Sequence, residues 1–323
     1  MQPNSPAAQP RPMVYALQQN IRRVIVGKDE AIELLLIALV CRGHVLIEDV
    51  PGVGKTTMAA ALAKSLQCSF KRIQFTPDVT PSDVTGFTMV NLQTGDMEFK
   101  PGAVMSQIVL ADEINRTSPK TQSSLLEAME ERQVTVDGTT HQLPQPFMVM
   151  ATQNPVEFAG TYPLPEAQLD RFLLCVSLGY PTVAEEVDIL ERYTSAGQSP
   201  LSQLQPVCAA QEILRLQSLL PQVYSSPELR QYIAEIAAAT RQHPLLSLGV
   251  SPRGSIALLK AAQAYALLSG RDYVLPDDVR QLIKPVLSHR IQLTPEARMK
   301  AVSPESLLDE LTAAVPVPIK RRV

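Results

Sequence analysis

A glycine-rich loop with a lysine and two threonines stands at residues 51–57, between an apolar run and a helix-forming run. Gly52 and Gly54 let the backbone turn tightly and aim successive N–H groups at phosphate oxygens. Lys55 would reach the β- and γ-phosphates of a nucleotide, and the Thr56 hydroxyl would bind magnesium. The alternative is a glycine-rich turn that binds nothing. The predicted phosphate-binding residues are Pro51, Gly52, Val53, Gly54, Lys55, Thr56 and Thr57.

Asp49 stands where the G-x-x-x-x-G-K-[ST] pattern has its first glycine. A carboxylate beside a triphosphate is electrostatically unfavourable. We therefore expect its side chain to turn away, for example to accept hydrogen bonds from backbone groups at the strand end.

Two adjacent acids, Asp112 and Glu113, end the apolar run 108–111. Asp112 could hold a magnesium ion through its water shell beside Thr56. Glu113, pointing the other way, could polarise a water for attack on the γ-phosphate. Taken alone, the pair could be two solvated acids at a strand end. The acids end a strand that follows the phosphate loop after one further helix and strand, and this order favours the catalytic interpretation.

Asn154 follows the apolar run 147–152. A terminal asparagine is usually a turn former. The order of the strands would instead place Asn154 between the acidic strand and the phosphate loop, where it could orient the attacking water.

Two arginines in segments far from the phosphate loop could also contact a phosphate. Arg171 ends a short helix before the last strand, so it would project from the subunit edge towards a neighbouring subunit's γ-phosphate. Pairing with Asp170 or Glu166 is the alternative. Arg253 lies near a helix start, where the helix dipole disfavours a cation, so an anion partner would explain it. The alternative is an ordinary exposed arginine.

Apolar runs alternate with helix-forming stretches up to about residue 178, which predicts an α/β fold: a parallel sheet with helices on both faces. Functional groups then belong at the carboxyl ends of the strands. Two inserted β-hairpins are predicted at 84–104 and 133–143, the second from Asp137-Gly138. The predicted strands are 44–47, 70–75, 107–111, 147–152 and 172–178, and the clearest helices are 57–66 and 119–132.

After residue 180 the pattern becomes helical. A helix is predicted at 184–193, a linker at 195–206, and an all-α domain from Cys208 onwards. Prolines are favoured in the first turn of a helix. The helices of the all-α domain are expected to start near Pro227, Pro252, Pro276 and Pro295.

Composition excludes several classes of protein. A net charge of −3 makes a nucleic-acid partner unlikely. Its four cysteines are far apart, without a C-x-x-C pair, so neither a zinc site nor a disulfide framework is expected. The N-terminus lacks the apolar core of a signal peptide, and the densest apolar run, 34–40, is too short to span a membrane. A soluble, cytoplasmic protein is predicted.

The loop, the paired acids, Asn154, Arg171 and Arg253, in this order, resemble the Walker A, Walker B, sensor 1, arginine finger and sensor 2 elements of an AAA+ ATPase. The segments 72–78, 81–86, 111–116 and 164–172 are similar to those of the MoxR family. That family resemblance implies Mg²⁺ and ATP as ligands, with Val26 and Gly27 beside the adenine. It also implies a homo-oligomeric, hexameric ring with ATP at the subunit interfaces. A protein client is implied too, often with a partner that carries a von Willebrand factor A domain.

The predicted function is ATP hydrolysis that drives remodelling, maturation or assembly of protein clients. The alternatives are a helicase-like motor, a magnesium-chelatase-like motor, and an ATP-gated scaffold with little turnover. The predicted domains are a flexible leader (1–13), a nucleotide-binding α/β domain (14–180), a connecting helix and linker (181–207) and a helical lid (208–323).

Overall fold

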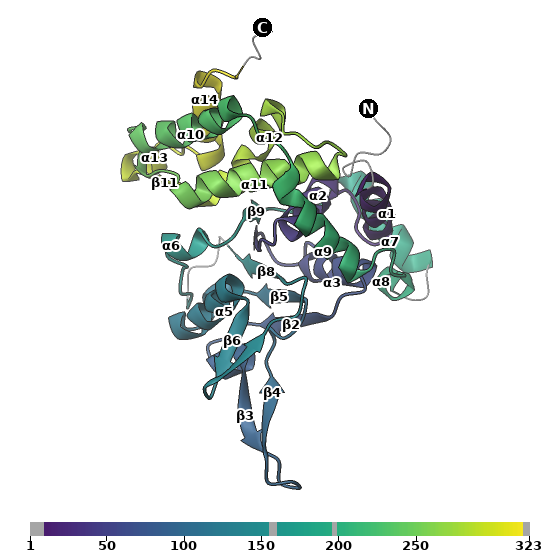
Figure 1. Ribbon diagram of the computed structural model, residues 1–323. Helices are drawn as coiled ribbons and strands as arrows, with labels where there is room; N and C mark the ends of the chain where they lie inside the picture. The colour runs from purple at the N-terminus through teal and green to yellow at the C-terminus, as the bar shows by residue number, and fades with distance from the viewer. Residues whose placement is uncertain (1–9, 155–159, 196–198, 319–323) are drawn as a thin grey trace.

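A five-stranded parallel sheet forms the centre of the protein, in the strand order β2-β5-β8-β1-β9 (Figure 1). The computed structural model describes residues 10–154, 160–195 and 199–318. The strands are β1 (Val45–Glu48), β2 (Phe70–Gln74), β5 (Ile108–Asp112), β8 (Met148–Gln153) and β9 (Leu174–Val176). All five predicted strands are confirmed. The last is shorter than predicted at both ends, since it begins at Leu174 and ends at Val176.

Helices cover both faces of this sheet, and alternate residues of each strand point to opposite faces. On one face, Ile108 and Leu110 pack in a cluster with α2 (Asp29–Val40) and α3 (Lys55–Ser65). On the other face, Val109 packs in a second cluster with α5 (Pro119–Glu131). The strands are almost wholly apolar because both faces are buried. The predicted α/β fold is confirmed.

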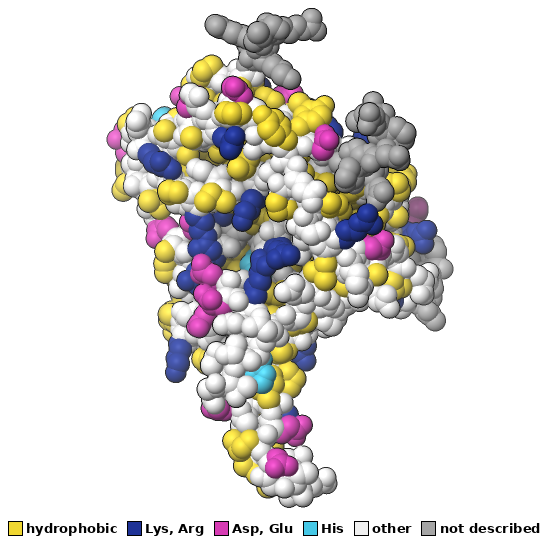
Figure 2. All heavy atoms as spheres, viewed as in Figure 1, with side chains coloured by type: hydrophobic (Ala, Val, Ile, Leu, Met, Phe, Trp, Pro, Cys, Tyr) yellow, Lys and Arg dark blue, Asp and Glu magenta, His cyan; other side chains and the backbone are white. Residues whose placement is uncertain are grey.

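Two hairpins project from the sheet, as predicted. The first joins β3 (Gly86–Val90) to β4 (Met97–Pro101) and follows the short helix α4 (Pro81–Thr85). The second joins β6 (Gln133–Val136) to β7 (Thr139–Gln142) through the Asp137-Gly138 turn, where both residues have positive φ. The β3–β4 hairpin is a narrow extension of the molecule that carries exposed apolar side chains (Figures 1 and 2).

Beyond the sheet the chain is mainly helical. All four predicted proline starts are confirmed, because each of these prolines is the first residue of its helix. Hydroxyl side chains cap three of those helices, and Ser251 is one of them. The region is not entirely α-helical, since β10 (Leu246–Leu248) pairs with β11 (Gln292–Leu293). The helices are α7 (Val183–Ser195), α8 (Pro200–Gln203), α9 (Ala210–Leu219), α10 (Pro227–Gln242), α11 (Pro252–Leu268), α12 (Pro276–Leu287), α13 (Pro295–Met299) and α14 (Pro304–Ala314).

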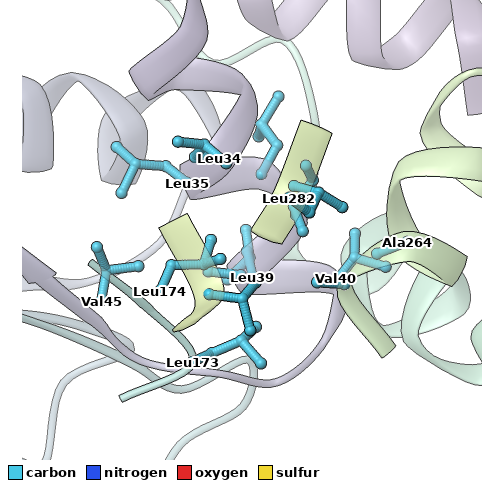
Figure 3. Close-up of a cluster of buried hydrophobic side chains, with 14 of the residues drawn as sticks. Leu34, Leu35, Leu39, Val40, Val45, Leu173, Leu174, Ala264 and Leu282 are labelled. Carbon is cyan, nitrogen blue, oxygen red and sulfur yellow. The ribbon is translucent and has the colours of Figure 1, made fainter. Parts of the chain in front are cut away.

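Apolar packing fixes this helical region against the sheet. Figure 3 shows leucines of α2 beside Leu174 of β9, Ala264 of α11 and Leu282 of α12. Burying a leucine side chain contributes about 1.5–3 kcal/mol relative to exposure. The helical region therefore packs against the edge of the sheet that is formed by β9.

The remaining elements lie at the N-terminus and between strands. α1 (Pro10–Arg22) begins before the predicted leader boundary at residue 13, and residues 1–9 lie outside the described residues. Short helices are α6 (Glu166–Leu169) and the 3-10 turns Ile114–Arg116, Leu220–Gln222 and Ser288–Arg290. The domain boundaries stay predictions. Within the described ranges, no helix is long and apolar enough to cross a membrane.

Candidate active site

The phosphate loop connects β1 to α3 and leaves the start of that helix open. Gly52 (φ 88°) and Gly54 (φ 93°) both lie in the left-handed region, and a Cβ at either would meet no atom within 4 Å. Gly54 is the N-cap of α3, and no side chain caps that helix. The first N–H groups of the helix and the positive end of its dipole therefore face open space, which is the arrangement that binds anions.

The Asp49 side chain turns away from this open space, as predicted. It is 6% exposed, and its Oδ2 accepts hydrogen bonds from the N–H groups of Leu178 and Gly179, the latter at 3.0 Å. The Ser177 hydroxyl donates to the same oxygen at 3.3 Å. Lys55 Nζ donates to the backbone oxygen of Asp49 at 2.9 Å. The carboxylate is therefore satisfied by the chain that leaves β9 and does not occupy the phosphate loop.

The two acids lie at the carboxyl end of β5 and differ in environment. Asp112 is 8% exposed, and its Oδ1 accepts a hydrogen bond from the Thr152 hydroxyl at 2.6 Å. Glu113 has φ 57°, and its N–H donates to the same hydroxyl at 2.9 Å. The left-handed turn at Glu113 takes its side chain out of the strand's alternation. Glu113 Oε2 then lies 2.8 Å from Gln74 Nε2 and 3.2 Å from Arg116 Nε.

One cavity of about 340 Å³ joins the phosphate loop to these acids. Asn154 also lines it, because β8 lies between β5 and β1 in the sheet. Val53 does not line the cavity and packs against the apolar core instead. The lining residues are Pro51, Gly52, Gly54, Lys55, Thr56, Thr57, Arg72, Gln74, Asp112, Glu113 and Asn154.

The chemistry of this cavity suits a magnesium–nucleotide complex. The uncapped helix start and Lys55 could supply donors and positive charge for phosphates, and Thr56 and Asp112 carry oxygen atoms of the kind that bind magnesium. Magnesium usually keeps several waters and takes only one or two carboxylates in addition to phosphate oxygens. The described residues contain no group of three or more His, Cys, Asp or Glu side chains that could hold a metal by themselves.

Two lining residues were not predicted as site residues. Arg72 and Gln74 come from β2, which pairs with β5 so that Gln74 stands beside Asp112. Their spacing of two residues puts both side chains on one face of the strand. The two-residue spacing of Arg72 and Gln74 could be read from the sequence. The pairing of β2 with the acidic strand could not.

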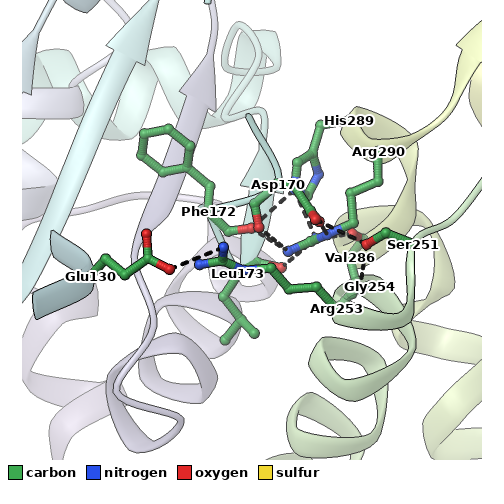
Figure 4. A network of polar contacts seen from close by, with 10 residues as sticks. All are labelled: Glu130, Asp170, Phe172, Leu173, Ser251, Arg253, Gly254, Val286, His289 and Arg290. Atoms are coloured by element: carbon green, nitrogen blue, oxygen red, sulfur yellow. Dashed lines mark hydrogen bonds and ion pairs between the residues drawn. The ribbon is translucent and has the colours of Figure 1, made fainter. Parts of the chain in front are cut away.

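Arg171 and Arg253 do not line this cavity. They meet at a second cavity of about 210 Å³, which is also lined by His44, the residue before β1. Arg171 pairs with Glu130 at 3.2 Å, not with Asp170 or Glu166. Arg253 pairs with the same carboxylate at 3.3 Å (Figure 4). The two cavities share no lining residue. The arginines thus lie at the amino end of the strands, and the phosphate loop lies at the carboxyl end.

A buried ion pair fixes the segment that carries Arg171. Arg290 Nε donates to Asp170 Oδ1 at 2.7 Å, and the arginine side chain is only 2% exposed. Ser251, the cap of the helix that carries Arg253, donates to the other Asp170 oxygen at 2.9 Å (Figure 4). Removing one partner of a buried pair leaves an uncompensated charge, which costs about 3–5 kcal/mol. Asp170 therefore links the two arginine-bearing segments.

The predicted adenine-side residues Val26 and Gly27 also lie outside the 340 Å³ cavity. Gly27 has φ 69°, and a Cβ there would come within 1.6 Å of Glu185 Oε1 on α7. Only glycine fits at this position without a shift of Glu185. The segment is a tight turn under α7, and its role towards adenine stays a prediction.

Comparison with known proteins places this chain in a family. Residues 44–174 match the ATPase family associated with various cellular activities (AAA), and residues 238–311 match the AAA lid domain. The protein named Chaperone MoxR1 from Mycobacterium tuberculosis is 41% identical over 307 residues, which cover 92% of this chain and 80% of that protein. This chain is a MoxR-type AAA+ ATPase.

Two further comparisons agree with the assignment. The MoxR-type ATPase is 56% identical to the uncharacterized protein YeaC from Bacillus subtilis, over 96% of both chains. A crystal structure of a candidate ATPase from Cytophaga hutchinsonii has a TM-score of 0.90 and 37% identity, and the match covers 97% of each chain. The protein therefore has ATPase activity, an AAA+ core and a helical lid.

Proposed function

We propose that this MoxR-type ATPase hydrolyses MgATP at interfaces between its own copies and uses the energy to remodel client proteins. The observation that carries the proposal is the separation of Arg171 and Arg253 from the phosphate loop within one chain. Arginines near a transferred phosphoryl group stabilise the charge of the transition state. A second copy, with its arginine-bearing surface against the 340 Å³ cavity, would complete the site.

The roles we propose inside the cavity follow from position and chemistry. The N–H groups of the loop and Lys55 bind the phosphates. Thr56 and Asp112 would hold Mg²⁺, which supplies charge neutralisation for the phosphates when bound. Glu113 accepts the proton of the attacking water, and Asn154 orients that water.

Two different surfaces meet in such a contact, so the association is head-to-tail. A head-to-tail contact closes into a ring when its rotation permits. We propose a hexameric ring as the state that turns over ATP. The isolated chain, which has no partner arginine, should then bind nucleotide and hydrolyse it very slowly.

The client-remodelling role rests on family membership. The relative from M. tuberculosis is named a chaperone, and by analogy we propose a chaperone-like role in the cytoplasm. We also propose, on the same ground, a protein partner that carries a von Willebrand factor A domain. Family membership favours this role over helicase-like and chelatase-like motors. Against an ATP-gated scaffold stands the full set of catalytic residue types: Asp112, Glu113, Asn154 and Arg171.

The experiment that tests the catalytic assignment is Glu113→Gln, with Glu127→Gln on the exposed face of α5 as the control. We expect Glu113→Gln to bind ATP like the wild type and to lose turnover by at least about a hundred-fold, because the general base is removed. Phosphate release and equilibrium nucleotide binding are both measured at concentrations that permit assembly. Normal hydrolysis by Glu113→Gln would refute the role of Glu113. The ATP-bound variant is also the form with which to capture a client.

A further inference from the structure

Arg72 binds the carboxylate that is proposed to face the metal. Its Nε and one terminal nitrogen (Nη2) donate to Asp112 Oδ2 at 3.1 and 2.7 Å. The other oxygen of Asp112 is already used by the Thr152 hydroxyl. Both oxygens of the carboxylate are therefore engaged by protein donors. Arg72 itself lines the 340 Å³ cavity, and its side chain is 46% exposed.

The position of this guanidinium opposes the arrival of a metal ion. A guanidinium is always protonated, and one that donates two hydrogen bonds to a single oxygen neutralises the charge that would attract a cation. Arg72 and Asp112 both line the cavity, so the Arg72 charge repels a cation that approaches Asp112 there. Since half of its side chain faces solvent in the cavity, Arg72 has room to move without disrupting the core.

We propose that Arg72 is a resident counter-ion of the nucleotide site, which neutralises Asp112 before the metal binds and yields Asp112 to Mg²⁺ when MgATP enters. This positioning role rests on the proposed function of the cavity and adds a residue to it. Arg72 thus sets how much Mg²⁺ the site needs.

The same arginine connects the two acids. Its terminal nitrogen donates to Gln74 Oε1 at 2.7 Å, and Gln74 Nε2 donates to Glu113 Oε2 at 2.8 Å. Displacement of Arg72 from Asp112 therefore disturbs one of the contacts that hold Glu113, another being its ion pair with Arg116. Metal binding at one carboxylate is coupled in this way to the orientation of the other.

The test measures metal affinity and does not depend on turnover. Each protein is saturated with a non-hydrolysable ATP analogue, and Mn²⁺, a paramagnetic stand-in for Mg²⁺, is titrated by electron paramagnetic resonance. The variants are Arg72→Ala, Arg72→Lys and Lys71→Ala. Lys71 lies on the opposite face of β2, so Lys71→Ala removes the same charge without touching Asp112.

We expect Arg72→Ala to bind Mn²⁺ about three- to five-fold more tightly than the wild type, the scale expected for removal of a partly exposed ion pair. Arg72→Lys should fall between the two, and Lys71→Ala should match the wild type. Thermal unfolding shows whether each variant is folded. If Arg72→Ala does not fold, Arg72→Lys is used to test the proposal instead.

Two results would overturn the proposal, and they differ in kind. Unchanged or weaker Mn²⁺ binding by Arg72→Ala, with normal binding of the analogue, would show that Arg72 only braces the two strands. Failure of the wild type itself to bind the analogue would overturn the proposed function together with the role of Arg72.

Discussion

Asp49 and Gly179 are joined by a hydrogen bond of 3.0 Å from the glycine N–H to the aspartate carboxylate. This contact ties the start of the phosphate loop to the chain that leaves the last strand of the sheet. It also explains why a carboxylate is tolerated at a position where the general phosphate-loop pattern has glycine. The negative charge is buried among backbone donors and does not face the phosphates.

We predict that Asp49→Gly, which restores the general phosphate-loop pattern, lowers the stability of the fold. Removal of the carboxylate leaves the N–H groups of Leu178 and Gly179 without their acceptor, a loss of about 1–3 kcal/mol in the free energy of unfolding. Nucleotide affinity should fall as well, since the loop is less firmly placed. Urea unfolding and calorimetric ATP binding measure the two effects.

The matched control for Asp49→Gly is Asp96→Gly, at the exposed tip of the β3–β4 hairpin. It should leave both quantities unchanged. Equal or higher stability of Asp49→Gly would contradict the structural role of this carboxylate.

Arg253 is predicted to act on the nucleotide of a neighbouring copy, which is also the role proposed for Arg171. Both arginines share Glu130, so the variants Arg171→Ala and Arg253→Ala should each lower turnover by the assembled protein. The loss of turnover in the double variant should be smaller than the combined losses of the two single variants, because the effects of residues that share a partner are not additive. ATP binding by the isolated chain should be unchanged.

Steady-state hydrolysis and nucleotide binding to the isolated chain test this prediction, with Arg230→Ala on the exposed face of α10 as the control. A loss of nucleotide affinity in isolated Arg253→Ala chains would mean that Arg253 contacts the nucleotide of its own chain instead.

His44 makes stability depend on pH. Burial between β1 and α5 lowers its pKa from the ordinary 6.5 to about 4, and its two ring nitrogens contact Met129 O and Val149 N–H at 3.0 Å each. The imidazole stays neutral in the fold, while the unfolded chain takes up a proton below pH 6.5. Its contribution is therefore fully present above pH 6.5 and is lost as the pH falls towards 4, by up to about 3 kcal/mol.

We expect the urea midpoint to fall between pH 7 and pH 4.5, with a smaller fall in His44→Gln. Burial and the neighbouring Arg290 also lower the pKa of His289, so that residue adds to the slope in both proteins. His141→Gln, in the β6–β7 hairpin, serves as the control. The same pH slope in His44→Gln as in the wild type would contradict the assignment.

Local pattern was enough to predict most of the fold. The buried strands were predicted because runs such as 108–111 are apolar at every position, as a sheet covered on both faces requires. The proline helix starts followed from the special chemistry of the first helical turn. The strand at 172–178 was predicted too long at both ends. At its carboxyl end, the N–H groups of Leu178 and Gly179 bind Asp49, about 130 residues earlier in the chain, and such a distant contact is not visible in a local pattern.

Contacts between distant segments were beyond sequence patterns. The pairing of Arg72 with Asp112 depends on which strand lies beside β5. The shared carboxylate of Arg171 and Arg253 depends on where the start of α11 lies relative to the end of α5. Sequence alone predicted the residue types of the site. The structure places them in two separate cavities.

Complementation between two inactive chains tests the central claim most directly. Lys55→Ala lacks the phosphate-binding ammonium but carries Arg171, whereas Arg171→Ala binds ATP but lacks the arginine. Each should be nearly inactive alone. Mixed in equal amounts, they should recover about a quarter of the wild-type rate, because one site in four then pairs an intact phosphate loop with an intact arginine in a randomly mixed ring. The control mixes Arg171→Ala with the double variant Lys55→Ala/Arg171→Ala, which offers no arginine and should restore nothing. If the first mixture hydrolyses ATP no faster than its separate components, the site is not shared between neighbouring copies.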